Sequence, residues 1–236
     1  MRAWTTPSRV DSAQEFGATV ARARQSLDEL AAANRFCRGT PSVLVSLAAL
    51  ASRLPAGELR VLDVGSGGGD IAQALVRWAR EVGRPIHIVA LDRHGEAVAR
   101  AAARSHGQAE IQHVRGDAFA LPFPPGSFDF VISSMMLHYF TFDEAARLLE
   151  TFARLAKRAV LVADVERHWF PCLAISVLAP LTGNRLIRRH FRDTVLHGFT
   201  PGELTQLAGA AGFARSRVRR YFPFRLVLVG ELDQRQ

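Results

Sequence analysis

Residues 61–70 read Val-Leu-Asp-Val-Gly-Ser-Gly-Gly-Gly-Asp, and this stretch decides the fold of the chain. An apolar run with one acid leads into four glycines within five residues. An amphipathic helical pattern follows, with the apolar residues Ile71, Leu75, Trp78, Ala79 and Val82. The order predicts a strand, a tight turn and a helix. Glycines in such a turn allow a positive φ and a close ligand, and ligands of open α/β sheets bind at the carboxyl ends of the strands. We therefore expect a nucleotide-like cofactor here.

The spacing of these glycines narrows the choice of cofactor. Counted from Gly65, the pattern G-x-G-x-x-G fails because Asp70 stands at its third glycine, and a count from Gly67 begins the turn two residues late. The phosphate-binding loop pattern also fails, since no Gly-Lys-Ser/Thr follows. The pattern that fits is D-x-G-x-G-x-G, which starts at Asp63. It resembles the cofactor loop of class I S-adenosylmethionine-dependent methyltransferases.

The rest of the chain predicts alternating helices and strands. We expect helices over 11–33, from Thr40-Pro41 to Leu54, over 95–105, and after capping boxes that begin at Thr141 and Thr200. We expect strands at 60–64, 85–92, 110–115, 128–134, 159–164, 214–221 and 224–231. Alternation of this kind predicts a mostly parallel sheet with helices on both faces. The last two strands are joined too tightly for a crossover and must form an antiparallel hairpin.

The predicted fold is therefore an α/β, Rossmann-like, seven-stranded sheet with one antiparallel strand near the C-terminus, as in the class I methyltransferases. The resemblance covers roughly residues 58–232. We expect one domain over 1–236. Its parts are an N-terminal helical cap (1–57), a cofactor-binding core (58–165), a lid insertion (166–199), and a C-terminal helix with a β-hairpin (200–236).

Composition excludes several classes of protein. Hydrophobic residues make up 48% of the chain and charged residues 22%, as in ordinary globular proteins. Cys37 and Cys172 form neither a zinc motif nor a disulfide framework. The sequence shows no signal peptide and no apolar run of about 20 residues, so we expect a cytoplasmic protein.

The net charge of +8 invites a nucleic-acid partner. Lys157 is the only lysine, however, and the arginines are scattered along the chain. The Asn/Asp-Pro-Pro-Tyr/Phe stretch of nucleic-acid amino-methyltransferases is absent after the fourth strand. The dipeptide at 171–172, Pro-Cys, follows the fifth strand and not the fourth, unlike in cytosine C5-methyltransferases. We expect no nucleic-acid substrate.

Acidic residues at strand ends support an adenosine ligand. Asp92 ends the second strand, where a carboxylate can accept bonds from both ribose hydroxyls, although a solvated turn acid or an NAD site would look alike. A buried Asp63 needs a cationic partner such as the methionine ammonium, or it merely caps nearby amides. The blocks Gly-Asp-Ala (116–118), Leu-Pro-Phe (121–123) and Ser-Phe-Asp (127–129) resemble those of ubiquinone and menaquinone C-methyltransferases.

That resemblance implies that Asp117 accepts from the adenine amino group and that Ala118 offers its amide to the ring. The full set of cofactor-binding residues that we predict for S-adenosyl-L-methionine is Asp63, Gly65, Ser66, Gly67, Asp92, Arg93, Gly116, Asp117, Ala118 and Ser133. No metal ligand is expected.

Methyl transfer to oxygen or carbon usually needs a base. The candidates are His138, Asp164, Glu166, His190 and His197. His138 leads because its segment, in the family, borders the departing methyl group and because an imidazole titrates near neutral pH. His190 and Glu166 are the alternatives that we retain for the catalytic site.

The expected acceptor is a small lipophilic aromatic molecule. Residues 166–199 combine apolar residues with a basic second half, which suits a lid over an apolar acceptor. A packed helix pair and an interfacial helix with peripheral membrane contact remain alternatives. Residues 34–40 resemble the N-terminal cap of bacterial methyltransferases of polyketide and quinone pathways, which methylate phenols or quinone-like rings, and we expect Arg35 or Arg38 to reach the cofactor carboxylate.

Two further functions stay open at this stage. One is an NAD-dependent oxidoreductase, and the other is a non-catalytic domain that keeps the fold as a binding scaffold. The sequence determines neither the acceptor, nor the methylated atom, nor the oligomeric state.

Overall fold

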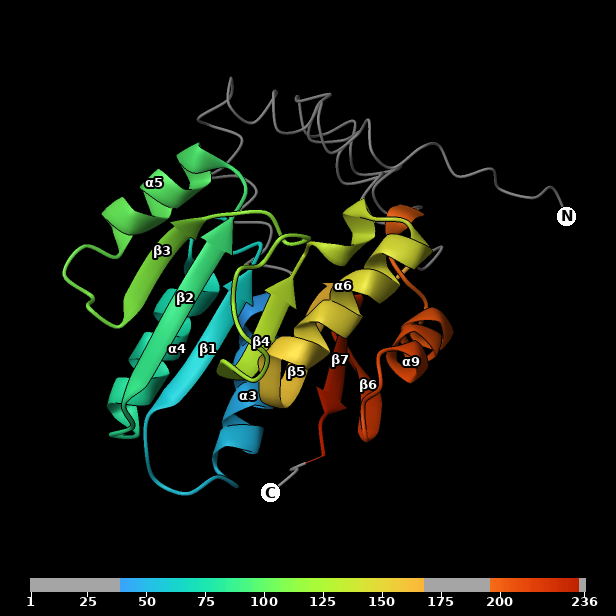
Figure 1. Ribbon diagram of the computed structural model, residues 1–236, viewed down its shortest axis with the longest axis horizontal. Helices are drawn as coiled ribbons and strands as arrows, with labels where there is room; N and C mark the ends of the chain where they lie inside the picture. Colours follow the sequence, from blue (N-terminus) through green and yellow to red (C-terminus); the bar gives the residue numbers. More distant parts are fainter. Residues whose placement is uncertain (1–38, 168–195, 234–236) are drawn as a thin grey trace, which may run out of the picture.

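The computed structural model describes residues 39–167 and 196–233, which form a seven-stranded sheet in the order β3-β2-β1-β4-β5-β7-β6 (Figure 1). The strands are β1 Leu59–Val64, β2 Ile86–Asp92, β3 Ile111–Arg115, β4 Phe128–Ser134, β5 Ala156–Val165, β6 Arg215–Tyr221 and β7 Arg225–Glu231. The helices are α3 Gly39–Ala51, α4 Asp70–Glu81, α5 Gly95–Arg104, the 3-10 turn η1 Leu137–Tyr139, α6 Phe142–Leu155 and α9 Pro201–Ala210. All seven predicted strands are present, within three residues of the expected bounds.

The sheet has one strand that runs against the others. Strands β1 to β5 pair in parallel, whereas β7 is antiparallel to both of its neighbours, β5 and β6. In Figure 1 the arrowheads of β1, β2 and β4 point toward the same edge and that of β7 points away from it. The predicted Rossmann-like sheet and its C-terminal hairpin are confirmed.

Strand β1 lies at the switch point of the sheet. It pairs with β2 on one side and with β4 on the other. The chain moves outward from β1 to β3 and then returns to β4, so the loops after β1 and β4 leave the sheet in opposite directions. Ligands of open α/β sheets bind at the carboxyl edge beside such a point. We therefore expect the ligand site at the segments that follow β1, β2 and β4.

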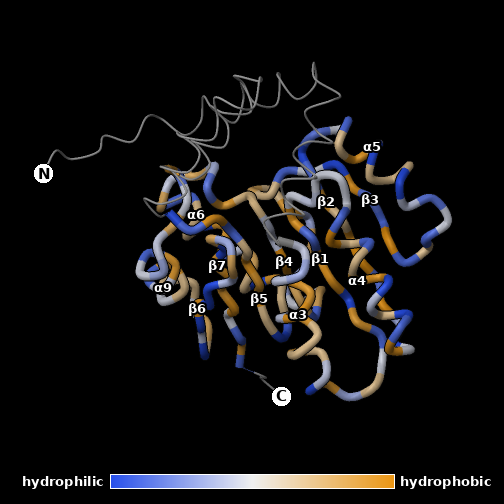
Figure 2. The backbone as a smooth tube through the Cα atoms, turned by 180° about the vertical axis from the view of Figure 1, so that it is seen from behind, coloured by the Kyte–Doolittle hydropathy of each residue, from blue (hydrophilic) through white to orange (hydrophobic). Residues whose placement is uncertain are grey.

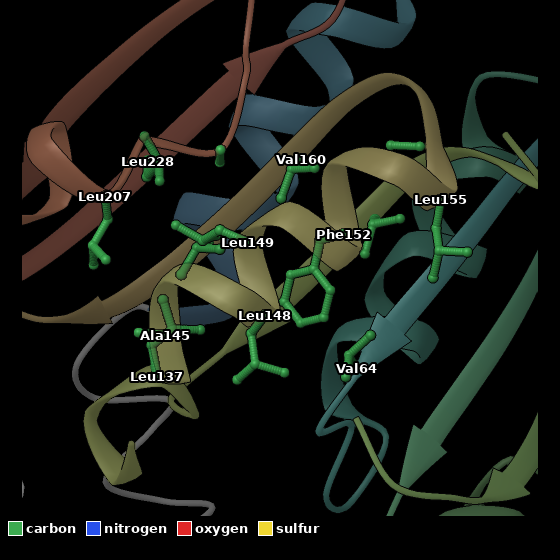
Figure 3. Packing of buried hydrophobic residues seen from close by; sticks show 14 of the residues in the cluster. Val64, Leu137, Ala145, Leu148, Leu149, Phe152, Leu155, Val160, Leu207 and Leu228 are labelled. Carbon is green, nitrogen blue, oxygen red and sulfur yellow. The ribbon is translucent and has the colours of Figure 1, made fainter. Parts of the chain in front are cut away.

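Each face of the sheet has its own hydrophobic core. One core joins α3 and α4 to the sheet, and the other joins α6 and α9 to the opposite face. Figure 3 shows the second core, where Leu148 and Phe152 of α6 lie among Val64, Val160 and Leu228 of the strands. Both predicted capping boxes, Thr141–Glu144 and Thr200–Glu203, begin these two helices.

The hydrophobic pattern follows this layering. In Figure 2 the central strands are mainly hydrophobic, whereas hydrophilic and hydrophobic residues alternate along α4 and α5. Val82, the last apolar residue of the predicted helical pattern, lies just beyond the end of α4 at Glu81 and is 55% exposed. Gly83, at φ 66°, then turns the chain toward β2.

Several predicted segments lie outside the described residues. They are the helix over 11–33, with Arg35 and Arg38, and residues 168–195 of the expected lid. Within the two described ranges, no helix is both long and apolar enough to span a membrane.

Candidate functional site

The glycine turn after β1 is folded around backbone bonds to β2. The amides of Gly65 and Ser66 both donate to the carbonyl oxygen of Leu91, at 2.8 and 3.0 Å. Gly65 and Gly67 have φ values of 74° and 52°, which disfavour any other residue. A Cβ on Gly65 would lie 2.7 Å from the Met136 sulfur, whereas one on Gly67 would meet nothing within 4 Å. The described residues thus leave the backbone of Gly67 open to a ligand.

Asp92 joins this turn to the end of β2. Its Oδ2 accepts from the Gly67 amide and its Oδ1 from the His94 amide, both at 2.9 Å. A carboxylate has about four acceptor sites, so each oxygen can accept one further bond. The side chain is 8% exposed. Asp92 is therefore held in a fixed orientation with capacity for two hydroxyl groups.

Asp63 is a buried acid without a complete set of partners. It is 1% exposed, and its Oδ2 has no hydrogen-bond partner among the described residues. Burial, and secondly repulsion by Asp92, raise the pKa of Asp63 to about 7. A buried carboxylate of this kind is stabilised by a cationic group, and none of the described residues provides one at that oxygen.

The two serines that end β4 have different environments. Ser133 is fully buried and its hydroxyl donates to the Val64 carbonyl oxygen at 3.0 Å, so it ties β4 to β1. The hydroxyl of Ser134 is buried and has no partner within the described part of the chain. Ser134 points to the same face as Asp63, because Asp63 pairs with Ile132 in the register and side chains alternate along a strand. The sequence prediction named Ser133 and omitted Ser134. Because side chains alternate along a strand, these two serines must point to opposite faces of the sheet, and this signal could have led to Ser134.

The segment after β3 is more exposed. Gly116 donates to the carbonyl oxygen of Asp92 at 3.0 Å, which brings this segment to the end of β2. Asp117 is exposed, and its Oδ1 accepts from the Phe119 amide at 3.0 Å. The Phe119 ring is 46% exposed and packs edge-on against Phe140, with 5.3 Å between centroids.

Three further predicted cofactor residues make mainly backbone contributions. Ser66 lies in the turn, where its carbonyl oxygen accepts from Gly69. Arg93 has an exposed side chain, and its carbonyl oxygen accepts from Arg115. Ala118 is half-buried against the core under α6. The structure thus brings the predicted set to the ends of β1, β2, β3 and β4.

A buried histidine–aspartate pair lies at the carboxyl ends of β4 and β5. His138 Nδ1 is 2.7 Å from Asp164 Oδ1, and the His138 amide donates to Asp164 Oδ2 at 3.1 Å. The two side chains are 1% and 0% exposed. His138 Nε2 is buried and has no partner among the described residues. The carboxylate therefore suits an Nδ1–H donor, and Nε2 makes no hydrogen bond within the described ranges.

The charge of Asp164 is stabilised despite its burial. Burial raises the pKa of this carboxyl group, but His138, the Val165 amide and Arg225 together hold the pKa below its usual value. Tyr139 packs against His138 at 4.2 Å between ring centroids. Burial and the nearby Asp164 raise the pKa of Tyr139 well above its usual value, so this phenol stays protonated.

The other candidate bases are placed differently. Glu166 is 6% exposed and accepts from Arg220 Nε at 2.8 Å, so an ion pair with β6 occupies one of its oxygens. His197 is buried beside Phe199, whose backbone pairs with Glu166. His190 lies outside the described residues. Among residues 39–167 and 196–233, no cluster of acids, histidines and cysteines could hold a metal ion.

Comparison with models of known protein families finds one match, to the central part of the chain. The profile of the family described as "Methyltransferase domain" matches residues 61–159, from β1 into β5. The matched stretch, less than half of the chain, is similar to methyltransferase domains. A comparison with curated protein sequences finds no match.

Solved structures of methyltransferases share the fold of this chain. Magnesium protoporphyrin IX methyltransferase from Synechocystis PCC 6803 with bound S-adenosylmethionine aligns with a TM-score of 0.63 and 16% identity, covering 98% of this chain and 100% of that one. A SAM-dependent methyltransferase from Aquifex aeolicus aligns at 0.62 and 18%, covering 88% and 97%. The CMeT domain of the citrinin polyketide synthase aligns at 0.62 and 13%, covering 82% and 52%. The predicted resemblance to class I methyltransferases is confirmed.

Proposed function

We propose that this chain transfers a methyl group from S-adenosylmethionine to an oxygen or carbon atom of a small, hydrophobic aromatic acceptor. The observation that carries the proposal is the buried Nε2 of His138, which has no partner among the described residues and belongs to a ring held by Asp164 on the segment that follows β4. A general base needs such a lone pair near neutral pH and a partner that fixes its tautomer.

The residues around the glycine turn fit the cofactor. S-adenosylmethionine supplies the methyl group on a sulfonium and carries an ammonium, a ribose and an adenine. Asp63 Oδ2, buried and without a partner in the described part of the chain, suits the ammonium, and Asp92 retains acceptor capacity for the ribose hydroxyls. The open backbone at Gly67 allows close approach, and the exposed Asp117 suits the adenine amino group. The Ser134 hydroxyl, which has no partner within residues 39–167 and 196–233, supplies a further polar contact.

The chain's own residues then perform two tasks. The first is to hold acceptor and cofactor in line, which by itself removes several kcal/mol of the barrier. The second is proton removal: His138 Nε2 takes the proton of the acceptor, and Asp164 stabilises the imidazolium that forms. A buried pair also excludes water from the step.

Aromatic side chains near this pair support an aromatic acceptor. Phe140 follows Tyr139 at the end of η1, and Phe119 packs edge-on against it. Exposed or half-buried rings offer edge-on and stacked contacts to another ring. The fold neighbours named for protoporphyrin and a polyketide synthase agree with a small organic acceptor. The helical cap and the lid, largely outside the described residues, are proposed to complete the pocket.

Two measurements test the proposal. Calorimetry with S-adenosylmethionine and with NAD, on the full chain, should give binding of the first only. Incubation with S-adenosylmethionine and a bacterial metabolite extract should yield S-adenosylhomocysteine and a product heavier by one methylene unit in mass spectrometry. Binding without turnover across extracts would favour the scaffold alternative, and binding of NAD would favour the oxidoreductase.

A further inference from the structure

The turn between β6 and β7 is apolar, whereas tight turns are usually polar. Glycine, proline, asparagine, aspartate and serine dominate turns, because they fix φ, allow a positive φ or bond the local backbone. Here the turn is Phe222-Pro223-Phe224, and Tyr221 precedes it. Pro223 follows the rule, but the two phenylalanines do not. Phe222 is 84% exposed, the highest value among the exposed large hydrophobic residues of the described ranges.

The backbone holds this turn in an unfavourable conformation. Phe224 has a φ of 47°, in the left-handed region that glycine adopts far more readily than phenylalanine does. Its carbonyl oxygen accepts from the Glu166 amide at 2.8 Å, which ties the turn to the end of β5. A single apolar residue on a surface is ordinary, but residues kept in strained conformations cluster at functional sites. The turn thus presents the Phe222 ring to solvent from a fixed base.

Cations flank the exposed ring. β6 is the last strand of the described sheet and contains four arginines and no acidic residue. Arg219 is exposed, and it forms no ion pair within residues 39–167 and 196–233. Arg220 donates to Glu166 through Nε, yet its side chain is 68% exposed. Because a guanidinium binds phosphate oxygens in pairs, these two arginines suit the phosphates of lipid headgroups beside the Phe222 ring.

The turn lies at the edge of the sheet that carries the proposed site. β7 is antiparallel to β5 and starts opposite its end, where Arg225 pairs with Val165. Val165 follows Asp164, which holds His138. In Figure 1 the start of β7 lies at the edge toward which β4 points. A membrane bound to the turn would therefore lie beside the same edge of the sheet as the histidine–aspartate pair.

We propose that the β6–β7 turn docks this protein on an anionic lipid bilayer: Phe222 inserts at the boundary of headgroups and acyl chains, and Arg219 and Arg220 bind lipid phosphates. An exposed ring with flanking cations has the chemistry of an interfacial anchor. An acidic protein would attract the arginines but would offer the ring no apolar phase. The inference deepens the proposed function and rests on it for its meaning, because a lipophilic acceptor dissolved in the bilayer would meet the site at the facing edge.

The test is co-sedimentation of the full chain with vesicles of phosphatidylcholine, alone or mixed in equal parts with phosphatidylglycerol. F222S removes the ring, F222W keeps an aromatic ring, and R219Q removes one cation beside it. V82S and R215Q are the matched controls. Val82 is an exposed apolar residue between α4 and β2, at the opposite edge of the sheet, and Arg215 is an exposed arginine at the far end of β6. Circular dichroism and the melting temperature check that each variant folds.

We expect the wild type to bind the mixed vesicles at least about tenfold more tightly than phosphatidylcholine alone, and high salt should remove the difference. F222S should bind the mixed vesicles about tenfold more weakly, because burial of the ring is lost. R219Q should bind them about fivefold more weakly. F222W, V82S and R215Q should bind as the wild type does.

Three results would overturn the proposal. Equal binding of F222S and the wild type would show that the chain attaches through another segment. Equal binding to both kinds of vesicle would exclude the anionic headgroups. A wild type that binds neither vesicle would exclude a membrane partner, and self-association that F222S abolishes would then assign the turn to a contact with a second copy of the chain.

Vesicle binding is measured without turnover, so it can fail independently of the proposed function. A chain that binds the mixed vesicles through Phe222 but never consumes S-adenosylmethionine would refute methyl transfer and keep the docking surface. Turnover by a chain that ignores vesicles would refute the docking surface alone.

Discussion

Replacement of Asp63 by asparagine should make the free protein more stable at alkaline pH. Asp63 is fully buried and repelled by Asp92, and its pKa is raised from 3.8 to about 7. The folded chain therefore binds the Asp63 proton more tightly than the unfolded chain does. This contribution to stability is complete below about pH 4 and is lost as the pH rises to about 7, and it amounts to about 4 kcal/mol. Asparagine carries no charge and avoids the loss.

The same substitution should weaken cofactor binding. An ammonium beside the carboxylate compensates the buried charge, so wild-type affinity for S-adenosylmethionine should increase as the pH rises through about 7. D63N should bind at least tenfold more weakly at about pH 8 and show little pH dependence, because one charge-assisted bond contributes about 1.5–3 kcal/mol. The D63N substitution should thus raise the stability of the free protein and lower its affinity for the cofactor. Such a trade-off is common for residues of binding sites.

Two assays measure these effects. Urea unfolding of the free protein between about pH 4 and pH 8 gives the difference in stability, which should grow with pH for D63N relative to the wild type. Calorimetry in two buffers of different ionisation enthalpy gives the affinity and the protons released on binding. D143N, at an exposed acid in the first turn of α6, is the control and should behave as the wild type.

The effect of D63N on stability and its effect on cofactor binding can be tested separately. Parallel pH–stability curves for D63N and the wild type would refute the account of Asp63 as a destabilised buried acid. Stabilisation of D63N together with undiminished cofactor affinity would keep that account and refute the ammonium contact.

Three further substitutions test the rest of the site. D92A should lose at least tenfold in affinity for S-adenosylmethionine by calorimetry, since two hydroxyl contacts of about 1.5–3 kcal/mol each disappear, and an unchanged affinity would exclude the ribose assignment. G67V should lower both the melting temperature and cofactor binding, because a β-branched residue is strained at a φ of 52°; a variant normal in both would move the cofactor away from this turn. H138A should lower kcat about a hundredfold with cofactor affinity intact, and the ascending limb of the pH–rate profile should vanish. Survival of that limb would direct the search to Glu166 or His190.

The sequence by itself determined the layers of the fold. Period-two and period-3.6 patterns are local, and so are capping boxes, which is why the strands and the helices from Thr141 and Thr200 were predicted closely. The glycine spacing after Asp63 and the acid at Asp92 are likewise local signals, and they led to the methyltransferase family. The exposure of Val82 was not evident from the sequence, because the pattern alone does not show where a helix stops.

Only the tertiary structure decided which side chains face each other. Asp164 is 26 residues from His138 in the sequence, and their contact depends on the pairing of β4 with β5. Arg225 likewise contacts Met135 across 90 residues of chain. Charge compensation in a buried site is set by distances of a few ångströms and by exclusion of water. Neither quantity is encoded in spacing along the chain, and so the contact of His138 with Asp164 emerges only in the folded protein.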